Sequence, residues 1–548
     1  MTHPLLEKLR TTTVGDHVGR RADPSRRALL EEWNRSGVRF VSSSDRLTER
    51  YYQAVSELFD CIGPADDDTP ILHEGGIYHG CWLESTGTIN AELLSRFLPS
   101  VTTATYSAFA NHQREDGLFP YKITAGGPAF SQIQLVSPLA RSVYNHHRLN
   151  KLDSGWLRHM YDAMSRYDGW LATHRDSLGT GAVEAFSTYD TGHDLSSRFW
   201  HVPDSPFGND PTRYDPQNPL LPFIAPDLTA NVTCQRTYLG LISQSLSIDG
   251  TEWHKKAEAS REALFAQCFE AEDGFFYDRD RHGRFVRVQS EVLLRVLACE
   301  IGDAELFRSA LERYLLNTRK FFAKFPLTSI ALDDPRFDHN FAQNSWAGPS
   351  NFLTLIRTPH AFEHYGHYTE LTWIMLPVVA ALTDADRFPQ TLNPFTGAAG
   401  FTEKYSPAIL CLLDFVERMS GILPRPDGTV WFTSVLPKPV LHKHETWEAA
   451  YARTIDGVTF ELVNTEAGGE IYRDGPLLCR FPPGTRVVLS RSGQIEGVVN
   501  LVSVKIDDSI WYEGQELAIS ILPNQTLAIR GGAPFSAQGP ELVLPQYA

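Results

Sequence analysis

Residues 189–200 combine side chains that transfer protons with side chains that bind polar ligands. The segment reads Tyr-Asp-Thr-Gly-His-Asp-Leu-Ser-Ser-Arg-Phe-Trp, and Gly192 permits a tight turn beside the acidic residues. A carboxyl group on such a turn can donate or accept a proton, and aromatic rings offer flat platforms for ligands. Asp194 is therefore the first candidate catalytic residue, although an aspartate at this position could instead cap a helix beginning at Leu195.

This segment resembles the catalytic loop of the (α/α)6-barrel glycosidases of glycoside hydrolase family 63. That group contains processing glucosidase I and the mannosylglycerate and glucosylglycerate hydrolases, and the trehalases are more distantly similar. In the family, a segment E-S-G-x-D-x-S-x-R follows an Arg-Asp pair, and its aspartate is the general acid. The resemblance implies this role for Asp194, whereas Thr191 replaces the family's glutamate. Matches in the family's order extend over residues 70–410.

Several other segments carry the resemblance. Tyr78-His-Gly-Cys-Trp-Leu-Glu84 is similar to the family's Y-x-x-x-W-x-D segment, with Glu84 in place of aspartate. Residues 113–120 match its Q-x-x-D-G-x-x-P turn, residues 134–138 its glutamine and proline loop, and residues 344–349 its W-x-G-P element. The candidate residues for substrate binding are Tyr78, Trp82, Glu84, Gln113, Asp116, Gln134, His193, Arg198, Trp200 and Trp346. The three tryptophans could instead be core residues, Arg198 a surface charge, and Glu84 and Asp116 acceptors for backbone turns.

The second catalytic position holds an amide. Inverting glycosidases need a protonated carboxyl on the leaving oxygen and, about 6.5–9.5 Å away, a carboxylate that activates water. In family 63 this carboxylate opens an E-x-Y-x-P-x-T-G segment that precedes an aromatic residue and a serine. Here Gln390-Thr-Leu-Asn-Pro-Phe-Thr-Gly397 precedes Tyr405-Ser406, so Gln390 occupies the general-base position.

An amide cannot take a proton from water, so three explanations of Gln390 stay open. The glutamine is an engineered replacement of glutamate that makes the protein an inactive variant, or another carboxylate is the base, or the chemistry has been lost or changed. Glu403 and Glu370 are the carboxylates that we consider as alternative bases.

Other clusters of potential ligands show weaker patterns. His360, His364 and His367 fall at i, i+4 and i+7, a spacing that can bind zinc on one helix face. Gly366 interrupts this helix, however, and the spacing fixes no acidic partner. Residues 273–280 lack the spaced carboxylates of a calcium loop and are interpreted as a structural turn. The sequence also contains no phosphate-binding loop, dinucleotide turn or nucleophile elbow. We therefore expect neither a metal nor a cofactor.

The elements that must position these residues are mainly helices. Apolar residues recur at helical spacing over 45–61, 91–112, 152–174, 229–247, 251–269, 290–302, 304–321 and 368–382. Longer segments rich in Gly, Pro, Trp, Asp and His lie at 74–88, 113–138, 176–216, 272–284, 335–350 and 386–406. Six such loops are what six helical hairpins in a ring would give, with the loops gathered at one end. This arrangement agrees with the (α/α)6 barrel that the resemblance implies.

The pattern changes after Gly428. Short β-rich runs at 458–463, 486–489 and 498–504 alternate with turn clusters, which is typical of antiparallel sheets. We predict a mainly α protein with an (α/α)6-barrel catalytic domain at 1–435, of which 1–44 are an N-terminal extension. A C-terminal antiparallel β-sandwich domain is predicted at 436–548.

Composition limits the partners of the protein. Its 50 Lys and Arg against 66 Asp and Glu give a formal charge of −16, which offers no electrostatic footprint for nucleic acid or an anionic membrane. No stretch approaches the roughly 18 apolar residues of a membrane span. The start lacks the apolar region of a secretory signal, so we expect a cytoplasmic location. Seven cysteines without a C-x-x-C pair argue against a disulfide framework.

These patterns together predict an inverting glycoside hydrolase that cleaves a small α-linked glycoside, with Asp194 as the general acid. A small carbohydrate is the expected partner, and the sequence predicts no oligomeric state. One alternative is a silent sugar-binding protein that lost its base at Gln390. Another is a carbohydrate lyase or epimerase on the same kind of barrel, because a fold alone does not determine the reaction.

Overall fold

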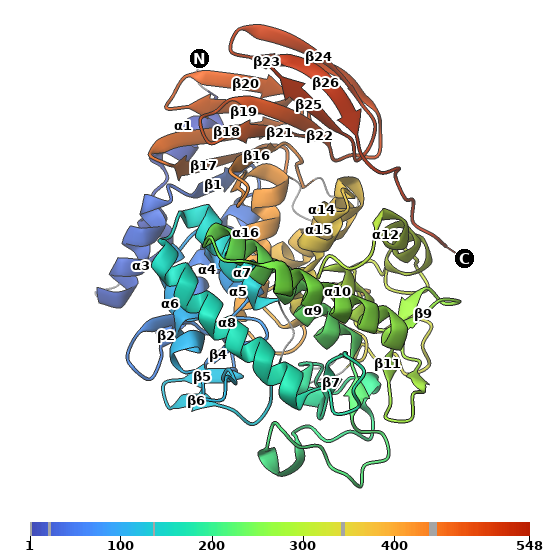
Figure 1. Ribbon diagram of the computed structural model, residues 1–548. Coiled ribbons are helices and arrows are strands. Elements are labelled where there is room, and N and C mark those ends of the chain that lie inside the picture. The colour runs from blue at the N-terminus through green and yellow to red at the C-terminus, as the bar shows by residue number, and fades with distance from the viewer. Residues whose placement is uncertain (1–2, 20–23, 135–137, 341–345, 438–445, 548) are drawn as a thin grey trace.

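The chain is rich in helices up to residue 420 and rich in strands beyond it (Figure 1). The computed structural model describes residues 3–19, 24–134, 138–340, 346–437 and 446–547. Two large sheets, orange to red in Figure 1, lie at one end of the helical region. Within the described ranges, none of the helices combines the length and the apolar character that a membrane span needs.

The helices of the described chain vary widely in length. They are α1 (Pro4–Thr11), α2 (Val14–Val18), α3 (Pro24–Arg35), α4 (Asp45–Asp60), α5 (Ile89–Leu94), α6 (Pro99–Asn111), α7 (Leu139–Asn150), α8 (Ser154–His174), α9 (Pro226–Ser245), α10 (Thr251–Cys268), α11 (Val292–Leu297), α12 (Ala304–Ala310), α13 (Phe352–Leu355), α14 (Thr358–His364), α15 (Tyr368–Asp384), α16 (Ser406–Ser420) and the short η1 (Thr188–Asp190), η2 (Ser197–Phe199), η3 (Phe207–Asn209) and η4 (Leu311–Leu315).

Local chemistry explains where the observed helices depart from the predicted ones. The predicted helix over 45–61 is α4, and the Ser44 side chain caps it by accepting a hydrogen bond from the Leu47 N–H. The predicted helix over 91–112 is instead divided into α5 and α6, because Pro99 has no N–H to donate and starts a new helix. Helix α16 was not predicted; all of its residues are buried, and its charged face of Asp414, Glu417 and Arg418 is paired inside the protein.

Two large antiparallel sheets form the strand-rich region. One has the order β1-β17-β18-β19-β20-β23-β24 and the other β15-β16-β21-β22-β25-β26. Their strands are β1 (Arg39–Ser42), β15 (Ile422–Pro424), β16 (Thr429–Thr433), β17 (Ala449–Ile455), β18 (Val458–Thr465), β19 (Gly468–Arg473), β20 (Leu477–Phe481), β21 (Thr485–Ser490), β22 (Ile495–Asn500), β23 (Ile506–Tyr512), β24 (Gln515–Ile521), β25 (Thr526–Arg530) and β26 (Ala533–Gln538). Strands β1, β15 and β16 come from before residue 436, so the sheets recruit segments outside 436–548.

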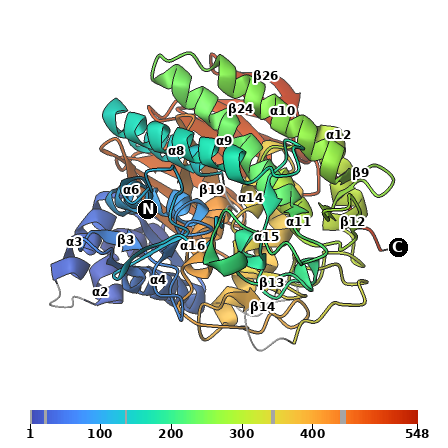
Figure 2. The same cartoon turned by 60° about the horizontal axis from the view of Figure 1, so that its bottom comes forward.

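Short strands hold the loops between the helices. They are β2 (Ile62–Pro64), β3 (Pro70–Leu72), β4 (Cys81–Trp82), β5 (Lys122–Thr124), β6 (Gly127–Ala129), β7 (Glu184–Ala185), β8 (Phe223–Ile224), β9 (Phe269–Glu270), β10 (Phe275–Phe276), β11 (Asp278–Arg279), β12 (Phe285–Val286), β13 (Ser350–Asn351) and β14 (Thr391–Leu392). Strands β4–β7 lie at the end of the helical region away from the large sheets (Figure 1). Turning that end forward brings β13 and β14 into view (Figure 2).

Glu370 joins the helical and strand-rich regions. Its carboxylate accepts hydrogen bonds from the Asn524 side chain and from the Val543 backbone N–H, both at 2.8 Å, and lies 3.0 Å from His367 Nδ1. The side chain is fully buried. Glu370 was an alternative general base, but its oxygens are occupied by these structural contacts, which corrects that assignment.

Candidate active site

The predicted site residues come from loops that the short strands and helix ends hold. Tyr78, Trp82 and Glu84 lie between β3 and α5, Gln134 lies before α7, residues 187–200 follow β7, Trp346 precedes β13, and Gln390 precedes β14.

A buried ion pair anchors the start of the loop that carries Asp194. Asp190 accepts a 2.7 Å hydrogen bond from Arg175, and both side chains are inaccessible to solvent. The Asp190 carboxylate also accepts hydrogen bonds from the backbone N–H groups of Ile133 at 3.1 Å and Phe186 at 2.8 Å. Because a buried carboxylate needs such partners, the first part of this loop has one well-defined position.

Arg198 anchors the end of the same loop. Its guanidinium donates to both oxygens of Asp278 at 2.8 Å, and to Asp227 at 2.9 and 3.2 Å. Arg198 also contacts His193 Nδ1. We had expected Arg198 to bind substrate, but its donors are used within the protein and the side chain is buried. Arg198 therefore positions the loop, and this corrects its predicted role.

His193 connects the loop to helix α11 and to Trp346. Its Nε2 pairs with Glu291, and its ring packs edge-to-face on Trp346 with the centroids 4.6 Å apart. Burial, reinforced by the positive charge of Arg295, lowers the pKa of His193 to about 3. The imidazole is thus neutral at pH 7. The Trp346 indole N–H is buried and has no hydrogen-bond acceptor among the described residues.

Asp194 is half-buried on a strained turn. Gly192 and Leu195 on either side of it have φ values of 68° and 56°, in the left-handed region. Leucine rarely adopts a left-handed conformation, because it costs of order 1–3 kcal/mol. Such strain is typical of functional loops. The helix that follows is η2, and its cap is Ser196, whose hydroxyl accepts from the Arg198 N–H. Asp194 therefore does not cap that helix.

Tyr78 links the two predicted catalytic positions. Its hydroxyl donates a 2.9 Å hydrogen bond to Oε1 of Gln390, which is itself buried. Burial, together with the negative charges of Glu74 and Asp194, raises the pKa of Tyr78, so the phenol stays protonated. Gln390 is held by backbone bonds to Phe352 and Phe401. The structure therefore brings Asp194, Tyr78 and Gln390 into one neighbourhood.

Glu84 and Gln134 join this neighbourhood. Gln134 donates to Glu84 Oε2 at 3.2 Å, and both side chains are buried. The Glu84 carboxyl lies directly against Gly192, where an added Cβ would overlap it. Burial raises the pKa of Glu84; the cation of Arg295 opposes this effect, whereas the charge of Asp194 adds to it. Glu84 is therefore biased toward its neutral, hydrogen-bond-donating form.

Gln113 and Asp116 do not contribute to this group, contrary to the prediction. The Gln113 amide donates to the backbone oxygens of Gly117 and Ala163, both at 2.8 Å. Asp116 accepts from Arg114 at 2.6 Å and from the Trp170 indole at 3.1 Å. These contacts hold the 113–120 turn against helix α8, so the residues are structural.

The remaining predicted residues differ in exposure. Trp82 is half-buried, with its ring 5.8 Å from that of Tyr78 and with the Lys122 ammonium 4.9 Å from its centroid. Trp200 is 55% exposed on the loop surface. Glu403 is exposed as well. Trp82 is thus the tryptophan whose partly open ring borders Tyr78.

Sequence reasoning missed several charged residues around the site. Glu74 is buried, accepts hydrogen bonds from Tyr405 and Ser85, both at 2.6 Å, and acts on Tyr78 through its charge. Asp278, within the segment interpreted as a structural turn, is a partner of Arg198. No local spacing indicates either role, because the partners are distant in sequence.

Comparison with known proteins places these loops in a family context. The model of the mannosylglycerate hydrolase MGH1-like glycoside hydrolase domain matches residues 94–407, more than half of the chain. Comparison with curated proteins finds no match.

Solved structures share the fold at low sequence identity. The family 63 mannosylglycerate hydrolase from Thermus thermophilus in complex with Tris is 19% identical, with a TM-score of 0.55 over 66% of this chain and 98% of that one. The neutral trehalase Nth1 from Saccharomyces cerevisiae is 11% identical, with a TM-score of 0.51 over 64% of this chain and 73% of that one. A family 78 rhamnosidase from Bacillus sp. GL1 is 12% identical, with a TM-score of 0.52 over 78% and 40%.

The contact between Gly192 and Glu84 can be tested by substitution. Gly192→Ala should displace the Glu84 carboxyl, whereas Gly179→Ala is a matched control, because Gly179 has a similar φ of 65° and open space around the added Cβ. Both variants should lose about 1–2 kcal/mol from the left-handed backbone. We expect Gly192→Ala to lose at least about 1 kcal/mol more, measured by urea unfolding. Equal losses would show that the close contact is absent.

The buried imidazole predicts a pH dependence of stability. His193 has a folded pKa of about 3, below the usual 6.5, so the unfolded chain binds its proton first. The free energy of unfolding should therefore fall as the pH drops from 6.5 toward 3, by up to about 1.4 kcal/mol per pH unit for this group. Although burial opposes it, Arg295 lowers the pKa of Glu291 to about 2, which adds a loss of the same sign below pH 4.5.

His193→Gln should make the profile shallower between pH 6.5 and 4.5, where Glu291 does not yet titrate. His254→Gln, at an exposed histidine of helix α10, is the control and should keep the original slope. Unfolding free energies from urea titrations at several pH values give the slopes. Parallel profiles for the wild type and His193→Gln would contradict a neutral buried imidazole.

Proposed function

Because the chain belongs to the mannosylglycerate hydrolase MGH1-like glycoside hydrolase family, we propose that it hydrolyses a small α-linked glycoside with inversion and uses Asp194 as the general acid. The family makes the chain a glycoside hydrolase of the family 63 type. The observation that carries the rest of the proposal is the placement of Tyr78, which hydrogen-bonds Gln390 and is affected by the charge of Asp194.

The proposed reaction divides between two sides of the sugar. On one side Asp194 protonates the leaving oxygen as the glycosidic bond breaks. On the other side a water attacks the anomeric carbon, held by the hydroxyl of Tyr78 and the amide of Gln390. The amide oxygen already accepts from Tyr78, which leaves the NH2 group to orient the water. Because the amide takes no proton, the attacking water releases its proton to solvent water as the new C–O bond forms, and this slower proton release makes the rate depend strongly on residue 390.

Charges around the site support this division. The oxocarbenium-like transition state is positive, so nearby carboxylates stabilise it. Glu74 acts on Tyr78 through its negative charge, and Asp194 becomes negative as it gives its proton to the leaving oxygen. The half-buried ring of Trp82, next to Tyr78, offers a platform for a sugar face.

The family and the low-identity structural neighbours guide the choice of substrate. A Thermus neighbour is described as a mannosylglycerate hydrolase, and related structures of it contain D-glycerate or glucose. We propose mannosylglycerate as the first substrate to test, followed by glucosylglycerate and trehalose. We also propose that the helices form an (α/α)6 barrel of residues 1–435 and that the two large sheets form a β-sandwich around 436–548.

A silent sugar-binding protein is the second candidate function. The specific observation that favours it is the amide of Gln390 at the position where the family has its general base. In that case the candidate active site would bind sugars without hydrolysing them. Measurements of hydrolysis and of binding on the same substrates separate the two functions.

Replacement of the proposed acid gives the first test. Asp194→Asn removes the transferable proton but keeps the size of the side chain, so hydrolysis of mannosylglycerate should fall by about 10²–10⁴. The melting temperature should change little, because Asp194 is only half-buried. Asp116→Asn, on the 113–120 turn, is the control and should keep its turnover. Normal turnover by Asp194→Asn would refute the assignment.

Restoring a carboxylate gives the second test. Gln390→Glu should raise kcat by about 10²–10⁴, because a carboxylate at this position can take the proton from water. Gln113→Glu is a matched control outside the site and should have no such effect. If the wild type already turns over and Gln390→Glu does not raise kcat, another carboxylate is the base. If neither protein hydrolyses the substrate but both bind it, the sugar-binding function is correct.

A further inference from the structure

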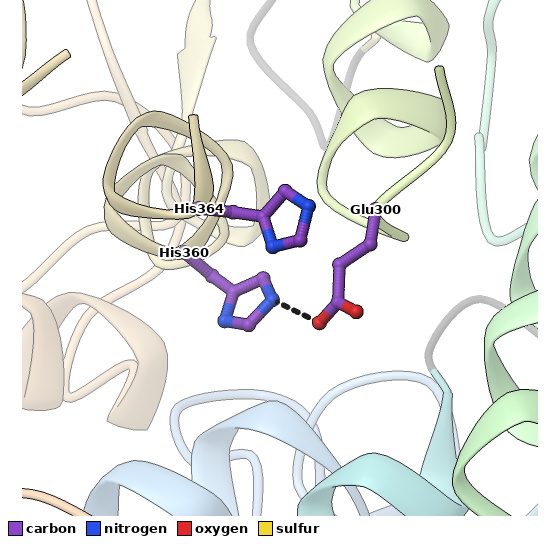
Figure 3. Close-up of side chains that lie close together, drawn as sticks. All are labelled: Glu300, His360 and His364. Carbon is purple, nitrogen blue, oxygen red and sulfur yellow. Dashed lines mark hydrogen bonds and ion pairs between the residues drawn. The ribbon is translucent and has the colours of Figure 1, made fainter. Parts of the chain in front are cut away.

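Three potential metal ligands lie close together: two histidines that the sequence pattern indicated and one acidic residue that it did not indicate. His360 and His364 project from the same side of helix α14 toward Glu300, which follows helix α11 (Figure 3). One ligand atom of each residue lies within 4.8 Å of the others. Among the residues that the structure describes, this is the one group of three His, Cys, Asp or Glu side chains with such spacing. His367 points elsewhere, because it bonds Glu370.

The ligand set suits a borderline divalent ion. Two imidazole nitrogens and one carboxylate oxygen are a common three-residue set for Zn²⁺, with a fourth position for water. Ligand atoms on one tetrahedral Zn²⁺ are about 3.3 Å apart, given bonds of about 2.0–2.1 Å. Glu300 Oε1 and His360 Nε2 are 2.8 Å apart, and the exposed His364 ring stacks on that of His360. Small side-chain movements therefore complete the geometry.

The surrounding residues hold Glu300 in place. Glu300 has a φ of 63°, a left-handed conformation that is unfavourable for glutamate. The Tyr238 hydroxyl donates to its Oε1 at 2.8 Å, and the Tyr365 hydroxyl donates to the next backbone oxygen, that of Ile301, also at 2.8 Å. Metal ligands commonly have such outer hydrogen bonds, which orient the ligand atoms.

The charges in this region allow a cation. Arg141 lies 4.0 Å from Glu300 and would by itself oppose a metal ion. The half-buried Glu92 carboxylate interacts with Arg141 through its charge and offsets it.

The cluster is separate from the candidate active site. Helix α11 begins next to Glu291, the partner of His193, and ends at Leu297, whereas Glu300 follows the opposite end of this helix. Helix α14 likewise follows Arg357, which donates to the backbone oxygen of Glu84, and ends at His364. A cavity of about 350 Å³, lined in part by Arg141 and Tyr238, reaches His360 of the cluster.

We propose that Glu300, His360 and His364 bind one Zn²⁺ or a similar transition-metal ion that clamps helix α11 to helix α14. The ion replaces the hydrogen bond between His360 and Glu300 with bonds to all three side chains. The ion connects the two helices away from the candidate active site, since Glu291 and Arg357 lie at their opposite ends. This inference does not depend on the proposed reaction.

Metal titration of the chelator-treated full-length protein tests the proposal. Calorimetry with Zn²⁺ should show one ion bound per chain, and Co²⁺ should give the visible absorption of a site with nitrogen and oxygen ligands. His364→Ala and Glu300→Gln should each weaken binding by about 100-fold or more. Tyr238→Phe, which removes only the outer hydrogen bond to Glu300, should weaken it by about tenfold.

His254→Ala, on the exposed face of helix α10, is the matched control and should bind Zn²⁺ as the wild type does. Zn²⁺ should also raise the melting temperature of the wild type but not that of His364→Ala. Because His364 is exposed, this variant is expected to fold, and its circular dichroism spectrum checks that. The proposal is overturned if no Zn²⁺ binds, or if His364→Ala and His254→Ala bind it equally well.

Discussion

The buried guanidinium of Arg198 is the interaction on which the geometry of the candidate site depends. It joins three segments that are distant in sequence: its own loop, helix α9 through Asp227, and strand β11 through Asp278. Removing one partner of such a buried network costs about 3–5 kcal/mol, because a charge is left without compensation. The network therefore has one arrangement, and it fixes the position of the loop that carries Asp194.

The same network extends from the loop into the core. His193 contacts Arg198 on one side and Glu291 on the other, and its ring packs against Trp346. The loop that carries Asp194 is thereby fixed to the segment of Glu291 and to the loop of Trp346, and none of these contacts uses the Asp194 side chain. A reactive group needs neighbours that are themselves held in place by further contacts. Displacement of the reactive group by about 1 Å can lower the rate about 10²-fold. The loops that carry Tyr78 and Gln390 are joined by the hydrogen bond between these two side chains.

Sequence patterns predicted part of this arrangement. Amphipathic periodicity located helices such as α4 but missed α16, whose charged residues Asp414, Glu417 and Arg418 are buried in ion pairs instead of facing solvent. The family match confirms the family resemblance. Asp194, Tyr78 and Gln390, which the family motifs indicate as site residues, stay predictions. The motifs could not assign Arg198 correctly, because a buried arginine between two aspartates has the same local sequence as one that binds a ligand. Its partners lie 29 and 80 positions away.

The histidine pair of helix α14 shows the same limit of local patterns, since its acidic partner comes from another helix end. For the reaction, the most direct measurement is a crystal structure of Asp194→Asn with bound mannosylglycerate. We predict that the glycosidic oxygen lies about 2.6–3.2 Å from the residue 194 side chain, with a water on the opposite face held by Tyr78 and Gln390. A sugar bound away from residue 194, or a Gln390 side chain more than about 10 Å from it, would contradict this account of the site.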